Sequence, residues 1–175
     1  MDVEAYQRAA DVQNVTGSTL ARGRALDAGE LRTLFATIAG HPHPTVRARD
    51  AAMLSVLYGA GVRRAEAVAL DVTDYDAATG ALAIRRGKGR QQRMVYATNG
   101  SRAALDAWLA VRDDVPGALF LPVTRHGRLR PEGQLTPHAV FAWLARLHAR
   151  AGVRPCSPHD LRRSFISERT SLALW

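Results

Sequence analysis

A histidine and an arginine stand late in this chain at a spacing that would place them on one face of a helix. They lie in the run Ser157-Pro158-His159-Asp160-Leu161-Arg162-Arg163. Ser157 and Pro158 are typical of the N-cap and first position of a helix, so His159 and Arg162 become neighbours one turn apart. Free N–H groups and the helix dipole make such a turn attractive to an anion such as a phosphate. The alternative is an ordinary solvated helix start with surface arginines.

A second arginine follows a sharp turn earlier in the chain, in Gly61-Val62-Arg63-Arg64-Ala65-Glu66. Gly61 permits the turn, and Arg63 falls at the start of the helix that follows. Glu66 comes one turn later, where its carboxylate would hold the Arg63 guanidinium. A guanidinium held in this way presents a planar fork that binds two phosphate oxygens. The alternative is an exposed ion pair worth only a few tenths of a kcal/mol.

Lys88 is the only lysine among the 24 basic residues. It lies in Gly87-Lys88-Gly89-Arg90, between strand-like runs at residues 81–85 and 93–96. This pattern predicts a β-hairpin with Lys88 at or beside its tip. Arginine keeps its proton near neutral pH, whereas lysine can release one. A lysine at this place could therefore donate a proton to a departing alkoxide, and the alternative is a solvent-facing turn lysine.

The elements that must position these residues are mostly helical. An Asp27–Glu30 capping box predicts a helix that ends at Gly40. Further helices are expected at residues 44–58, from about residue 63, at residues 101–111, and after Thr136-Pro137 and Ser157-Pro158. With the hairpin, these elements predict a mainly α domain with a small antiparallel β-sheet (α+β). Residues 2–13 are expected to form a short helix and residues 14–24 a linker.

Three further expectations concern where particular residues lie in the fold. The inner face of the helix at 44–58 is expected to consist of Ala51, Leu54, Ser55 and Tyr58. Tyr75 stands among polar residues and is assigned to a turn. Cys156 is the only cysteine, so it cannot form an internal disulfide and is expected to be a packing residue rather than a nucleophile.

Composition limits the class of protein. The formal net charge of +8 and the pI near 10.9 favour a polyanionic partner, most simply nucleic acid, over an inert basic surface. Apolar residues make up 47% of the chain, which argues against global disorder. No apolar run is long enough for a membrane-spanning helix, and the first residues lack the order of a signal peptide. We therefore expect a reduced, cytoplasmic protein without membrane contact.

Taken in order, the three motifs resemble the catalytic domain of tyrosine recombinases, the family that includes phage integrases and chromosome-dimer-resolving enzymes. The resemblance extends from about residue 25 to residue 165 and rests on residues 58–70, 86–93 and 157–165. It implies that Arg63, supported by Glu66, and Arg162 clamp the scissile phosphate. It also implies that Lys88 protonates the leaving 5′ oxygen and that His159 assists proton transfer or contacts a phosphate oxygen. Further DNA contacts are expected from the arginines near these motifs: Arg64, Arg86, Arg90, Arg93 and Arg163.

The resemblance further implies double-stranded DNA and other recombinase protomers as partners. It implies no metal and no nucleotide cofactor, because the arginines supply the positive charge. In the family a tyrosine beyond the His-x-x-Arg motif attacks the phosphate and forms a 3′-phosphotyrosyl link, which conserves the bond energy for strand joining. This chain has no tyrosine after Tyr96. We therefore expect a DNA-binding fragment of a site-specific recombinase or integrase that lacks its own nucleophile and does not cut DNA alone.

The boundaries expected from the resemblance divide the chain into two parts. Residues 1–24 would be the end of a preceding helical domain with its linker, and residues 25–175 a catalytic domain that lacks its C-terminal segment through a frameshift or a premature stop. Three alternatives stay open: a tyrosine supplied in trans by another protomer, a non-catalytic DNA-binding or regulatory module that reuses the fold, and a basic protein with chance motif matches. The last alternative predicts that the motif residues do not converge on one concave surface.

Overall fold

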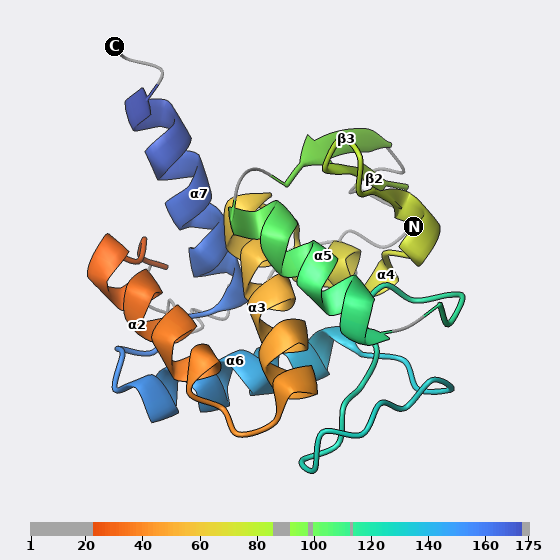
Figure 1. The fold of residues 1–175 in the computed structure, drawn as a ribbon. Helices are drawn as coiled ribbons and strands as arrows, with labels where there is room; N and C mark the ends of the chain where they lie inside the picture. The colour runs from red at the N-terminus through yellow and green to blue at the C-terminus, as the bar shows by residue number, and fades with distance from the viewer. Residues whose placement is uncertain (1–22, 86–91, 98–99, 113, 173–175) are drawn as a thin grey trace, which may run out of the picture.

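The computed structural model describes residues 23–85, 92–97, 100–112 and 114–172, with side chains as far as residue 166. The mainly α architecture with a small antiparallel sheet is confirmed (Figure 1). The described helices are α2 (Ala28–Ala39), α3 (Pro44–Gly59), α4 (Arg64–Ala69), α5 (Gly100–Arg112), α6 (Pro137–Ala151) and α7 (Pro158–Leu172), with a 3-10 turn, η1 (Val72–Asp74). The strands are β1 (Tyr75–Asp76), β2 (Ala81–Ile84) and β3 (Arg93–Tyr96). The expected helix at residues 2–13 lies outside the described residues.

Helix α3 lies at the centre of the fold, packed against α2, α4, α5 and α7. Every residue from Ala52 to Leu57 is buried, because a helix covered on all sides has no single apolar stripe. The inner face predicted from helical spacing is therefore too narrow. Leu54 and Ser55 are buried as predicted, but Ala51 and Tyr58 are only partly buried.

Three of these helices begin at the capping motifs that the sequence predicts. At the start of α2, the Asp27 carboxylate accepts a hydrogen bond from the Glu30 N–H at 2.8 Å, and Glu30 accepts one from the Asp27 N–H at 3.1 Å. The Thr136 hydroxyl caps α6, at 3.1 Å from the N–H of the third helical residue. At the start of α7, the Asp160 carboxylate accepts hydrogen bonds from the N–H and the hydroxyl of Ser157, both at 2.8 Å. These local bonds fix where each helix starts.

The sheet has the order β1-β2-β3 and is antiparallel throughout. Leu82 on β2 lies opposite Val95 on β3, and Ile84 opposite Arg93, so the two strands of the predicted hairpin are confirmed. The segment that joins them lies outside the described residues. The predictions for Arg86, Lys88 and Arg90 fall in that segment.

Strand β1 is not anticipated by the sequence, because two residues are too few to show an alternating pattern. Tyr75 lies in β1 opposite Leu82 and is buried, with its hydroxyl donating to the Asp106 carboxylate on α5 at 2.9 Å. The assignment of Tyr75 to a polar turn is therefore wrong. Burial, aided by the hydrogen bond to Asp106, raises the pKa of its phenol well above the usual range.

Cys156 is buried, and this burial raises the pKa of its thiol to about 11, which fits a packing residue rather than a nucleophile. Across the ranges that the structure describes, no helix is long and apolar enough to cross a membrane. Figure 1 shows α7 starting beside α3 and ending clear of the other labelled elements.

Candidate phosphate-binding site

The turn between α3 and α4 joins two parts of the site through Gly61. Its φ of +60° lies in the left-handed region, which favours glycine. A Cβ atom at this residue would lie 2.4 Å from the Phe165 ring of α7, so the ring packs directly against the turn. The Gly61 carbonyl also accepts a hydrogen bond from Arg162 Nη1. Gly61 therefore holds α7 and the Arg162 guanidinium against the start of α4.

Arg63 occupies the N-cap position of α4, and Glu66 is the third helical residue. One Glu66 oxygen accepts from the Arg63 N–H at 2.8 Å, and the other accepts from Arg63 Nη1 at 2.8 Å. The ion pair expected from the spacing of these residues is therefore present. Because the same carboxylate binds backbone and side chain, it fixes the guanidinium relative to the helix start.

Arg93, at the start of β3, binds the same carboxylate from the sheet side. Its Nη1 and Nη2 donate to the two Glu66 oxygens at 2.8 and 2.7 Å. Glu66 is buried, and burial alone would raise its pKa, but the hydrogen bonds from Arg93 and Arg63 outweigh it and lower the pKa to about 2. Glu66 is thus ionised at neutral pH and bridges two arginines. The sequence does not predict this contact, because Glu66 and Arg93 are far apart in the chain.

Arginines from the motif at residues 58–70 and from the motif at residues 157–165 line one pocket of about 410 Å³. Arg63, His159 and Arg162 all line it, and Arg64 lies at its edge with its guanidinium carbon 5.8 Å from the centre of the Phe141 ring. Burial, together with the charges of Arg63 and Arg93, lowers the pKa of Arg162. The remaining lining residues belong to α4, α6 and the start of α7: Ala65, Phe141, Ser157 and Pro158. The pocket thus concentrates positive charge beside the first turn of α7.

Arg163 points away from this pocket. Its Nη1 donates to the Gly23 carbonyl, where the described chain begins. The next residue, Ser164, is buried, and its hydroxyl accepts from the Leu26 N–H at 2.7 Å. One side of α7 therefore carries the candidate phosphate ligands, while another side binds residues 23–26, at the start of the described chain. Only the tertiary fold decides that these adjacent arginines face different ways.

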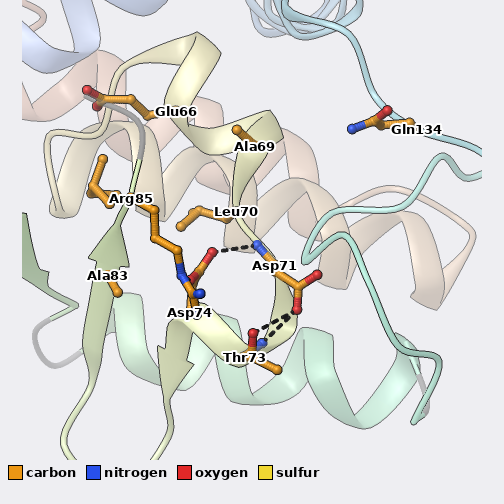
Figure 2. Close-up of a pocket in the computed structure, with 10 residues that line it drawn as sticks. Glu66, Ala69, Leu70, Asp71, Thr73, Asp74, Ala83, Arg85 and Gln134 are labelled. Carbon is orange, nitrogen blue, oxygen red and sulfur yellow. Dashed lines mark hydrogen bonds and ion pairs between the residues drawn. The ribbon is translucent and has the colours of Figure 1, made fainter. Parts of the chain in front are cut away.

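A second pocket, of about 420 Å³, is lined by Glu66 and is shown in Figure 2. Its polar groups largely bind one another: the Asp74 carboxylate accepts from the Asp71 N–H at 2.9 Å and from Arg85 Nε. The Asp71 carboxylate accepts from the N–H and hydroxyl of Thr73, both at 3.0 Å. In the described part of the chain, no group of three or more His, Cys, Asp and Glu residues is arranged to hold a metal ion.

The fold and the arginine-lined pocket are those expected of the recombinase class of proteins, and comparison with known proteins agrees. The model of the phage integrase family matches residues 24–168. The chain is 38% identical over 122 residues to tyrosine recombinase XerC of Azotobacter vinelandii, covering 68% of this chain and 38% of that protein. It is 31% identical over 144 residues to tyrosine recombinase XerA of Thermococcus onnurineus, covering 82% and 48%. The chain therefore belongs to the phage integrase family.

Solved structures show the same fold. A crystal structure of XerA recombinase superposes with a TM-score of 0.71 at 22% identity, covering 98% of this chain and 59% of that one. XerH recombinase bound to its difH substrate, in a pre-cleavage complex, gives a TM-score of 0.62 at 25% identity, covering 86% and 44%. This chain spans less than half the length of the curated relatives named above.

Proposed function

We propose that this chain binds duplex DNA by holding a backbone phosphate between Arg63 and Arg162, as the phosphate-binding part of a site-specific tyrosine recombinase or integrase. The observation that carries the proposal is that guanidinia from two distant motifs line one pocket beside the start of α7. XerH site-specific recombinase was solved bound to its difH substrate, and the Tn1549 transposon integrase, which has the same fold, was solved in complex with a circular intermediate DNA. Both structures support DNA as the partner. Other recombinase protomers are proposed as further partners, and the cytoplasm as the compartment.

The proposed chemistry follows from the donors around the pocket. Arg63, held by Glu66, presents a planar fork to two phosphate oxygens. Arg162 would complete the clamp, and the pair would stabilise the charge that grows on these oxygens in the transition state. His159 is exposed at the pocket, where it would contact a phosphate oxygen or assist proton transfer. Lys88 as the proton donor to the leaving oxygen stays a prediction from the resemblance.

Removing either clamp arginine is expected to weaken DNA binding. For Arg63→Ala or Arg162→Ala we expect an increase in Kd of about tenfold at low salt, because hydrogen bonds to charged groups are worth roughly 1.5–3 kcal/mol. In each variant the slope of log K against log salt concentration should become shallower by about one, as expected for the loss of one phosphate contact. Fluorescence anisotropy with a labelled short duplex, over a salt series, measures both quantities.

Arg32→Ala is the matched control for these variants. Arg32 lies exposed on α2, so its removal takes away the same charge without touching the pocket. We expect it to change Kd by less than about twofold, because exposed charges act mainly through the screened net field. If wild type binds the duplex and both clamp variants bind equally well, the phosphate pocket is not the binding site.

The chain alone is expected to bind DNA without forming a covalent link. Tyr75 is buried and bonded to Asp106, whereas Tyr96 lies exposed on β3 and does not line the Arg63–Arg162 pocket. Incubation with a nicked duplex followed by a denaturing gel should therefore show no protein–DNA band. A shifted band that persists in denaturant would contradict this expectation, and its loss in Tyr96→Phe would identify the attacking residue.

A further inference from the structure

The Glu66 carboxylate is shared between two arginines in a defined way. Each of its oxygens accepts one hydrogen bond from Arg63 and one from Arg93, with all four distances between 2.7 and 2.8 Å. An ionised carboxylate offers about four acceptor sites. Its capacity is thus filled, and Arg162 is bonded instead to the Gly61 carbonyl.

Arg93 stands behind the phosphate pocket rather than in it. Arg63 and Arg162 line the pocket, whereas neither Glu66 nor Arg93 does. Both terminal nitrogens of Arg93 are directed at Glu66, and this two-point contact fixes the plane of the carboxylate as well as its position. The arginine itself is anchored at the start of β3, opposite the buried Ile84 of β2.

We propose that Arg93 is a positioning residue, which fixes the Glu66 carboxylate so that it holds the Arg63 guanidinium in place to bind a DNA phosphate. The inference rests on the proposed function of the pocket, because the positioned group is one of its two arginines. It assigns Arg93 a role through Glu66, in place of the direct DNA contact expected from its motif.

The first test compares single and double variants in duplex binding. Arg93→Met removes the charge and the fork at similar length, and we expect Kd to rise about fivefold, less than for Arg63→Ala. Because both changes act on the same guanidinium, the double variant should bind no more weakly than Arg63→Ala alone. Arg85→Met is the matched control, since Arg85 is a nearby exposed arginine paired with Asp74 instead, and its effect should multiply with that of Arg63→Ala.

The second test measures Glu66 itself without DNA. The groups that face it are Arg63 from α4, Arg93 from β3 and Arg162 from α7, with Asp74 and Arg85 in the adjoining pocket. Carbon-13 NMR of the side-chain carboxyl group should give a pKa of about 2 in the wild type. In Arg93→Met we expect a clearly higher value, because burial then opposes ionisation with one ion-pair partner fewer. Arg93→Lys keeps the charge and should give an intermediate value.

The outcomes separate this inference from the function on which it rests. Losses of affinity that multiply in the Arg63→Ala, Arg93→Met double variant would make Arg93 a direct DNA contact and overturn the proposal. So would wild-type affinity in Arg93→Met. If the wild type fails to bind duplex DNA, the proposed function fails, but the pKa of Glu66 still tests the role of Arg93. A Glu66 pKa that is the same in Arg93→Met as in the wild type would show that Arg93 does not fix the carboxylate. Should Arg93→Met not fold, Arg93→Lys carries both measurements, with the same non-additivity expected.

Discussion

Replacing Gly61 by alanine is expected to lower the free energy of unfolding by about 2–5 kcal/mol, the sum of roughly 1–2 for a left-handed residue and 1–3 for overpacking. The backbone cost arises because φ is +60° at this position. The packing cost arises because the new methyl group would meet the Phe165 ring at 2.4 Å. Denaturant unfolding followed by circular dichroism measures the loss.

Gly152→Ala separates these two costs. Gly152 also has a left-handed φ, of +65°, but no atom lies within 4 Å of an added Cβ. We therefore expect this control to lose only about 1–2 kcal/mol. Combining Gly61→Ala with Phe165→Leu should restore part of the stability, because a smaller side chain makes room for the methyl group. Equal losses in Gly61→Ala and Gly152→Ala would show that Phe165 does not press on the turn.

Glu66→Gln is expected to destabilise the protein by about 3 kcal/mol near neutral pH, since a lowering of the pKa from its ordinary value of 4.5 to about 2 converts at roughly 1.4 kcal/mol per pH unit. The amide keeps the size of the side chain but lacks the negative charge that binds both Arg63 and Arg93. Guanidinium unfolding at fixed ionic strength, repeated over a pH series, measures the effect.

The pH dependence has a defined sign. The pKa of Glu66 is lower in the folded state than in the unfolded state, so its contribution is fully present above about pH 4.5. It is lost as the pH falls through about 2. The difference in stability between wild type and Glu66→Gln should therefore shrink across this window. Glu132→Gln, an exposed loop residue, serves as the control and should lose little at any pH. A constant difference across the series would contradict the ion-pair explanation.

Much of the fold and part of the site follow from short-range patterns. Asp27 with Glu30, and Thr136 before Pro137, identify helix starts because the hydrogen bonds concerned join residues only a few positions apart. The contact between Arg63 and Glu66 is of the same kind, at a sequence separation of three residues. The spacing of the motifs also led to the family, which the match over residues 24–168 then established.

Other features of the site depend on contacts between distant parts of the chain. Arg93 binds the Glu66 carboxylate, Arg163 faces Gly23 rather than the pocket, and the Phe165 ring packs against Gly61. The two residues of each pair lie far apart in the chain, so no local sequence pattern predicts their contact. Each contact forms only when the helices and strands pack.

The sequence by itself therefore determined the helix starts, the hairpin strands, the family and the residue types of the proposed phosphate clamp, because each of these depends on local spacing or on an ordered series of motifs. Only the tertiary structure decided which arginines line the pocket and which are bonded to groups outside it. The physical reason is that the direction of a guanidinium is set by the carboxylate or carbonyl that packing places beside it.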